Sequence, residues 1–243
     1  MPSTSETGHA KNVANFQDLI SFCTGYGAAY NPSNTRLSLA QLTALYTLAQ
    51  QKLADVKTEK TAFDNATNER VIIFDGLKQL ATRITNAFAA SGTTDEAVKD
   101  VQTINRKIQG ARAEKLPEPD PANPGAPLPA SHSVSQQSYD NLLDSFSSLI
   151  TTLSGNPLYT PNEADLQMAA LQTKQTSMQT ATTAVTNTYT DYSNAIISRD
   201  EKLYDEETGL VATAGDVKKY VKSIFSASSP EYAQVSGLQF KTP

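Results

Sequence analysis

Reactive side chains are scarce in this chain of 243 residues, which has no tryptophan, one cysteine and two histidines. Because Cys23 stands alone, no internal disulfide can form, and no cluster of Cys and His could hold zinc. Cys23 is expected to be a buried thiol, with a reactive thiol as the alternative. His9 and His132 belong to polar stretches, so we expect both at the surface and neither as a buried base.

Motifs of catalysis and cofactor binding are missing as well. The sequence contains no Ser-His-Asp set, no P-loop, no Gly-rich dinucleotide turn and no metal-binding pair of histidines. The acidic cluster around Asp205 lacks the alternating ligands of a calcium-binding loop. We therefore predict a non-enzymatic protein with no catalytic residue, no cofactor and no metal site. An enzyme or carrier that uses the space between helices stays open as an alternative.

Long apolar runs and broad basic patches are also absent. No stretch of about 18 apolar residues occurs, so no membrane-spanning helix is expected. The net charge is −5 and the 20 basic residues are spread along the chain, which argues against nucleic acid as a partner. The polar first residues lack the features of a secretory signal, which predicts a cytoplasmic protein, although export without a cleaved signal would leave no such mark.

An internal duplication is the main positive feature. Residues 30–75 and 159–204 align without a gap, and identical or similar side chains recur, as in Tyr30/Tyr159, Pro32/Pro161 and Phe63/Tyr192. After eight extra residues in the second copy the register resumes, with Leu80, Ile84 and Phe88 opposite Val217, Val221 and Phe225. This pattern predicts an all-α fold, an elongated helical bundle of two internal repeats related by a pseudo-two-fold axis.

The duplication and the proline content predict the boundaries of the parts. We expect a flexible tail over 1–12, a first helical repeat over 13–113, a linker over 114–135 and a second repeat over 136–243. Six prolines in the fourteen residues from 116 to 129 predict the linker, with a proline-rich docking ligand as the alternative. A short helix from Val13 to Cys23 opens the first repeat, and its expected counterpart begins at Tyr139.

Long helices follow in both repeats. Apolar residues recur every seven positions between Arg36 and Ser91, which predicts a coiled-coil-like helix of some 55 residues, roughly 80 Å long if Gly76 does not break it. The second copy repeats this pattern from Leu171. Thr160 and Glu163 have capping-box spacing before that helix. We expect the helix to break at Gly209 and Gly215, and a last helix to run from Asp216 to about Ser226.

Two polar pairs occur at equivalent positions of these helices, Asn65 with Arg70 and Asn194 with Arg199. Each Arg falls on the apolar seam, where a charge is costly unless it is paired. We predict that these four residues fix the register between long helices. Ligand contacts repeated in both copies are the alternative.

Threonine is concentrated in the second long helix, with eight among residues 173 to 190. Threonine is a mediocre helix former, so packing against the first copy or against neighbouring molecules is expected to stabilise this helix. Tyrosines of the kind that is enriched at interfaces recur from Tyr189 to Tyr232, with core filling as the more common use of any one of them.

The segment from Val217 to Tyr232 and the Tyr-x-Pro motifs at Tyr30 and Tyr159 resemble those of small duplicated helical proteins of Bacteroidota genomes. That resemblance implies a helical fold and no assigned activity.

The sequence thus predicts a structural or interaction protein, a scaffold or self-assembling subunit that contacts other proteins or further copies of itself through helix faces. The alternative is a membrane-active helical protein, a pore former or a binder of the membrane surface. Lys218, Lys219 and Lys222 could touch an anionic membrane, but three lysines give only weak attraction.

Overall fold

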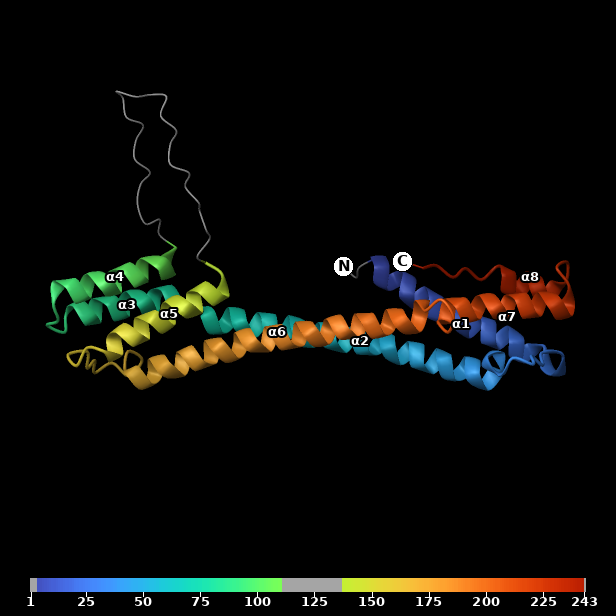
Figure 1. Ribbon diagram of the computed structural model, residues 1–243, viewed down its shortest axis with the longest axis horizontal. Helices are drawn as coiled ribbons and strands as arrows, with labels where there is room; N and C mark the ends of the chain where they lie inside the picture. The colour runs from blue at the N-terminus through green and yellow to red at the C-terminus, as the bar shows by residue number, and fades with distance from the viewer. Residues whose placement is uncertain (1–3, 111–136, 243) are drawn as a thin grey trace, which may run out of the picture. The chain divides into compact units, whose positions relative to one another are not determined.

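The computed structural model describes residues 4–110 and 137–242, and all of its regular structure within these ranges is helical (Figure 1). The all-α prediction is confirmed. The main helices are α1 Thr4–Gly25, α2 Leu39–Phe74, α3 Leu77–Ala89, α4 Asp95–Gln109, α5 Tyr139–Ser154, α6 Met168–Tyr204, α7 Leu210–Phe225 and α8 Pro230–Ser236. Two short 3-10 turns, η1 Gly27–Ala29 and η2 Thr35–Leu37, precede α2.

The chain forms two compact units. Unit 1 comprises residues 1–64 and 187–243, and unit 2 comprises residues 65–186. Unit 1 therefore holds α1, α7 and α8, unit 2 holds α3, α4 and α5, and the long helices α2 and α6 contribute residues to both. These units differ from the successive segments 13–113 and 136–243 expected from the sequence, because each unit takes residues from both. The expected linker over 114–135 lies outside the described residues.

The core of unit 1 lies between α1, α7 and the parts of α2 and α6 that belong to this unit. Its fully buried side chains include Phe16, Leu19, Leu42, Leu203 and Val217. Each apolar side chain of this size contributes about 1.5–3 kcal/mol when it is fully buried.

Helix α1 corrects the expectation of a flexible tail over 1–12. It begins at Thr4, and it buries the polar side chains of His9 and Asn12. His9 Nδ1 shares a hydrogen bond with the hydroxyl of Tyr204, which also accepts one from Asn12 Nδ2 at 3.3 Å. His9 is thus not the surface residue that the sequence predicted, because its partner lies 195 residues away and local composition cannot show it.

The core of unit 2 lies between α3, α4, α5 and the first part of α6, and α4 packs against both α3 and α5 (Figure 1). The side chains of Thr94 and Ser138 cap the first turns of α4 and α5. Such caps typically contribute about 1 kcal/mol each. The large side chains that are fully buried here are Ile84, Phe88, Ile108, Phe146, Leu149, Leu153, Leu171 and Met178.

Part of the seven-residue seam is buried, at Leu42, Ala49 and Val56 on α2, whereas Phe63 and Arg70 further along it are half-buried. However, the expected helix of some 55 residues is interrupted. Helix α2 ends at Phe74, and Gly76 has a φ of 71°, a left-handed conformation that glycine adopts without the steric cost of a Cβ. Helix α3 starts directly after it.

The connection between α6 and α7 also differs from the expectation. Asp205 Oδ1 accepts hydrogen bonds from the backbone N–H groups of Glu207 and Thr208 and from the Thr208 hydroxyl, which forms a tight turn. Helix α7 then begins at Leu210 and runs through Gly215, so the predicted break at Gly215 and helix start at Asp216 are wrong.

The start of α6 needs a similar correction. The helix begins at Met168, five residues beyond Glu163, so Thr160 and Glu163 do not form a capping box on it. A turn precedes the helix instead, in which Leu166 N donates to Glu163 O at 3.0 Å.

Candidate functional site

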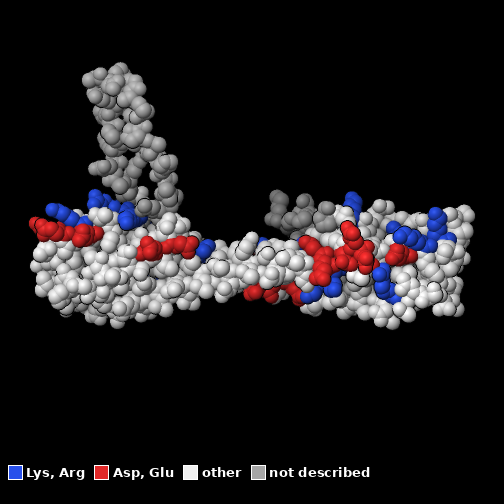
Figure 2. Space-filling view, viewed as in Figure 1, with Lys and Arg blue, Asp and Glu red and all other residues white. Residues whose placement is uncertain are grey.

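The outer face of α6 within unit 2 carries no charge. From Gln172 onward its exposed side chains are threonines and glutamines only, namely Gln172, Thr173, Thr176, Gln179, Thr180, Thr183 and Thr186, which we call the α6 face. Figure 2 shows charged side chains along α4, whereas the lower edge of this unit, where the first half of α6 runs, is uncharged in this view. The opposite side of the helix buries Leu171, Met178 and Val185.

The threonine hydroxyls of the α6 face are largely satisfied by their own helix. Thr173, Thr176 and Thr186 donate to backbone carbonyls four residues earlier, at 2.8, 3.0 and 3.3 Å. A hydroxyl that bonds back in this way uses its only donor within the helix. The α6 face can therefore be covered by a partner without leaving these three donors unsatisfied.

A matching face lies on α2 within unit 1. The residues that align with the α6 face are exposed and uncharged from Thr43 to Ala54, and with the exposed apolar Leu48 they form what we call the α2 face: Thr43, Ala44, Thr47, Leu48, Gln50, Gln51 and Ala54. Thr43 and Thr47 again donate to carbonyls four residues earlier. Each unit thus exposes one uncharged helix face.

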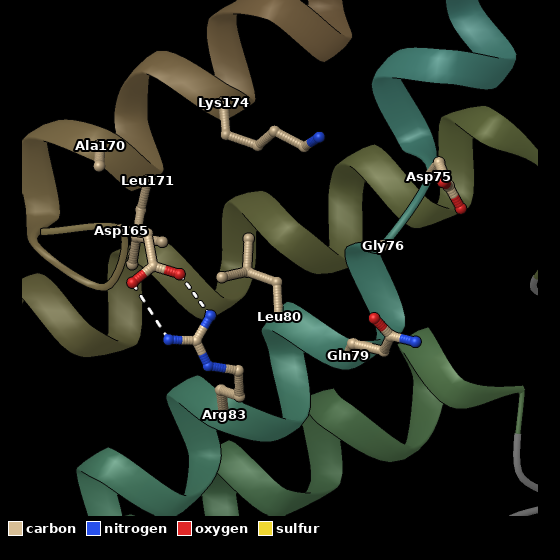
Figure 3. A pocket seen from close by; sticks show the side chains of 9 residues that line it. All are labelled: Asp75, Gly76, Gln79, Leu80, Arg83, Asp165, Ala170, Leu171 and Lys174. Atoms are coloured by element: carbon tan, nitrogen blue, oxygen red, sulfur yellow. Dashed lines mark hydrogen bonds and ion pairs between the residues drawn. The ribbon is translucent and has the colours of Figure 1, made fainter. Parts of the chain in front are cut away.

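An open pocket of about 350 Å³ lies in unit 2, next to the turn between α2 and α3 (Figure 3). Gly76 turns the chain so that Asp75 and Gln79 line one side, and Leu171 and Lys174 of α6 line the other. Arg83 of α3 reaches across to Asp165, which precedes α6. The pocket is thus formed by segments at least 82 residues apart in sequence.

The Arg83–Asp165 pair is bidentate, because Nη1 donates to Oδ2 and Nη2 donates to Oδ1 at 3.1 Å. The hydrogen bond from Arg83 lowers the pKa of Asp165, and the hydrogen bond to Asp165 raises the pKa of Arg83. Both side chains are about half exposed, so this pair positions the loop before α6 more than it stabilises the fold.

Lys174 is the cation that this pocket offers to a ligand. Its ammonium extends into the pocket (Figure 3), and among the described residues it has no ion pair. Val71 and Ile72, on the last turn of α2 beside Asp75, are 51% and 66% exposed. Neither of these two side chains lines the pocket, so the charge of Lys174 is the feature that the pocket presents to solvent.

The four predicted register residues lie in different surroundings. Asn65 and Asn194 are exposed, so they do not share the buried seam. Arg199 is buried, and it contacts Asp200 through Nε at 2.9 Å and through Nη2 at 2.8 Å. The guanidinium of Arg70 lies 4.1 Å above the ring of Tyr139, a cation–π contact, and no described residue forms a hydrogen bond with its buried Nε. The register role of these residues stays a prediction.

The remaining reactive side chains, Cys23, Tyr30 and Tyr159, are buried and contribute to packing. Burial raises the pKa of Cys23 to about 12, so its thiol stays protonated, as expected for a buried cysteine. Tyr30 and Tyr159 each donate a hydrogen bond to a backbone carbonyl seven residues later. Within residues 4–110 and 137–242 no group of His, Cys, Asp or Glu could hold a metal ion. His132 lies outside the described residues.

Among the helices that the structure describes, none contains a stretch long and apolar enough to cross a membrane. The membrane-active alternative stays a prediction.

Sequence reasoning missed both the pocket and the polar contacts of α1. The pocket depends on the left-handed turn at Gly76 and on the Arg83–Asp165 pair, which joins positions 82 residues apart. Sequence spacing gives no sign of such a pair. The α6 face, in contrast, had a signal in the excess of threonine over residues 173–190.

Comparisons with protein families, with curated proteins and with solved structures find no match for this chain. The functional argument therefore depends on the geometry of the described residues.

Proposed function

We propose that this chain is a non-enzymatic interaction protein, a scaffold or self-assembling subunit that contacts further copies through the α6 face and the α2 face. The observation that carries the proposal is the absence of charge on these two faces, although 19% of all residues are charged. Charged side chains are depleted at the centres of protein interfaces, because their desolvation opposes binding.

The threonines of these faces can be buried against a partner at low cost. Where a threonine hydroxyl donates to a carbonyl of its own helix, its methyl group remains available for packing against the partner. Small side chains also let a second helix approach closely. Because both faces occur once per chain, each subunit could contact two neighbours, which is the requirement for growth beyond a dimer.

The internal duplication belongs to the same proposal, and two sets of contacts support it. The Tyr30 and Tyr159 hydroxyls donate to Leu37 O and Leu166 O at 2.8 and 2.9 Å, so both copies contain the same latch before the long helix. Phe63 and Tyr192, which align in sequence, stack at 6.3 Å with nearly parallel rings. The coiled-coil pairing and the pseudo-two-fold relation stay predictions.

Burial also refines the alignment at the start of each copy. The sequence pattern placed the start of the counterpart of the helix from Val13 to Cys23 at Tyr139. The fully buried residues instead match Phe16 with Phe146 and Leu19 with Leu149. The first helices of the two copies, α1 and α5, thus present the same apolar spacing.

A double substitution tests the α6 face. Thr176→Glu with Thr183→Glu places two carboxylates on it, and Glu has a higher helix propensity than Thr, so the fold is expected to persist. We expect the assembled fraction in sedimentation velocity to fall at least tenfold. The matched control is Gln102→Glu with Thr103→Glu on the charged, exposed surface of α4 in the same unit, which should leave assembly unchanged. Equal assembly of both variants and the wild type would remove the α6 face from the proposal.

A further inference from the structure

The segment after α8, residues 238–242, lies against α1 and α7 in unit 1. We call it the tail segment, and we call the surface of α1 and α7 that it covers the groove. The tail segment contains no helix, and residues of both helices hydrogen-bond to its backbone. Its side chains alternate, since Leu238 and Phe240 are partly buried while Gln239 and Lys241 are exposed. This alternation is characteristic of an extended strand.

Two asparagines of α1 recognise the tail backbone. Asn12 Nδ2 donates to Lys241 O at 2.6 Å, and Lys241 N donates to Asn12 Oδ1 at 3.0 Å. One turn later on α1, Asn15 Nδ2 donates to Gln239 O at 2.6 Å. Asn12 and Asn15 are 2% and 5% exposed, so their amides are buried beneath the tail segment and are not solvated.

Lys218 of α7 completes the polar contacts. Its ammonium donates to Leu238 O and lies 5.2 Å from the centre of the Phe240 ring. Burial lowers the pKa of this lysine. Together, Asn12, Asn15 and Lys218 bind the main chain at 238, 239 and 241, and main-chain groups are common to all peptides.

Side-chain selectivity comes from the apolar positions. The Phe240 ring meets the fully buried Phe16 edge to face, with centroids 6.5 Å apart and an interplanar angle of 82°. Leu238 packs against the same core. Main-chain hydrogen bonds combined with sites for alternate side chains are the basis on which proteins bind extended peptides.

We propose that this groove is a binding site for an extended peptide of the pattern Leu-x-Phe, and that the tail segment of a second copy can replace the one that occupies it here. The second copy is the partner favoured by the structure, because it carries the identical segment and all contacts of the groove fit that segment. Exchange of an identical element between subunits is a low-cost route to association. This inference rests on the proposed self-assembly and names one contact for it.

A labelled peptide with the sequence of residues 236–242 tests the site in the full chain. The double variant Leu238→Asp and Phe240→Asp should release the tail segment, and its groove should bind the peptide at least tenfold more tightly than the wild-type groove, where the tail competes. Fluorescence anisotropy measures this difference. Failure of the released variant to bind, while circular dichroism shows intact helices, would overturn the proposal.

Changes in the groove and in the peptide distinguish recognition of the peptide backbone from nonspecific apolar binding. In the released variant, adding Asn12→Ala should weaken peptide binding at least tenfold. Lys11→Ala, at the neighbouring exposed position on the same helix, should have no effect. A peptide N-methylated at the residue equivalent to Lys241 lacks the donor to Asn12 Oδ1 and should also bind at least tenfold more weakly. Equal binding in all these cases would contradict the proposed site.

Hydrogen exchange on the wild-type chain keeps the proposal testable if the released variant does not fold. Replacement by a second copy requires that the tail segment opens while α7 stays intact. The Lys241 amide should therefore exchange at least a hundredfold faster than the Val217 amide. Equal rates would mean that the tail leaves only on unfolding, which would overturn the proposal.

Failure of this site differs from failure of the proposed function. If assembly persists when the added peptide is in excess, the groove is not a contact between copies, and the helix faces remain as the contacts. If the chain stays monomeric while the groove still binds the peptide, the helix-face proposal fails and the site is retained.

Discussion

Units 1 and 2 share an apolar framework but differ in the polar groups that complete it. Both contain a tyrosine latch, Tyr30 in unit 1 and Tyr159 in unit 2, and both bury a phenylalanine, Phe16 of α1 or Phe146 of α5. In both, a short helix follows a long one after a turn. The shared features are those that burial and backbone geometry require.

The differences lie where α1 and α5 meet the long helices. In unit 2, Tyr139 near the start of α5 contacts Arg70 and Phe74. In unit 1, His9 of α1 hydrogen-bonds to Tyr204, and asparagines on the same helix bind the tail segment. Helix α5 thus makes an aromatic contact in unit 2, whereas α1 makes polar contacts with Tyr204 and with the tail segment in unit 1. The polar contacts of α1 carry the peptide site that we propose for unit 1.

The largest expected effects come from the shared phenylalanines. Phe16→Ala and Phe146→Ala each leave a cavity in a fully buried site and should lower the free energy of unfolding by about 3–5 kcal/mol. Because α2 and α6 contribute to both units, we expect both variants to shift one common transition in urea. Two separate transitions, each moved by only one variant, would show that the units fold independently.

The two turns should respond differently to alanine. At Gly209 an added Cβ would lie 2.5 Å from Asp205 O, so Gly209→Ala should cost about 1–3 kcal/mol. At Gly76 there is space, and Gly76→Ala should cost about 1–2 kcal/mol because of its positive φ. Gly215 lies inside α7 with open space around it, so Gly215→Ala is the control and should stabilise by up to about 1 kcal/mol. Thermal unfolding measures all three, and a destabilised Gly215→Ala variant would contradict the helix assigned there.

The tyrosine latches should contribute equally. Tyr30→Phe and Tyr159→Phe each remove a buried hydroxyl together with its hydrogen bond to a carbonyl, and each should cost about 1 kcal/mol. Chemical denaturation of the two variants gives the comparison. A cost in only one of them would show that the latches are not equivalent, which would weaken the proposed duplication.

Alkaline pH should test the burial of Cys23 in unit 1 and of Tyr159 in unit 2. Burial raises the pKa of Cys23 from 9.0 to about 12 and that of Tyr159 from 10.0 to about 12. Both groups keep their protons in the folded chain and lose them first in the unfolded chain, so stability is full below pH 9 and falls as the pH rises toward 12. Cys23→Ala should flatten the decline that begins at pH 9. Tyr159→Phe should affect only the decline above pH 10. Identical pH profiles for the wild type and both variants would contradict the burial of these groups.

The smallest change in stability is expected at the seam arginines. Arg70→Leu and Arg199→Leu replace a buried or half-buried cation by an apolar side chain, which should alter stability by no more than about 1 kcal/mol. If these residues fix register, the variants should stay helical by circular dichroism but form several assembly states in place of one. An unchanged single state would remove the register hypothesis.

The sequence was sufficient for the all-α class and for the buried residues Leu42, Ala49 and Val56 of the seam, because the period of the apolar residues is a local signal. It predicted the break at Gly209, but it left open whether a helix of some 55 residues runs through Gly76, where the chain instead takes a left-handed turn. It misplaced the start of α1, because His9 and Asn12 are stabilised by partners 192 residues or more away. The sequence also could not predict the two compact units, because each unit combines residues from both halves of the chain.

Sedimentation of the wild-type chain over a wide range of concentration tests the central claim most directly. Assembly through uncharged helix faces requires the weight-average mass to rise above the 26.2 kDa of a single chain as the concentration increases. It also requires that rise to persist at high salt, because no charge pairs are involved. A mass that stays at 26.2 kDa throughout would contradict the account.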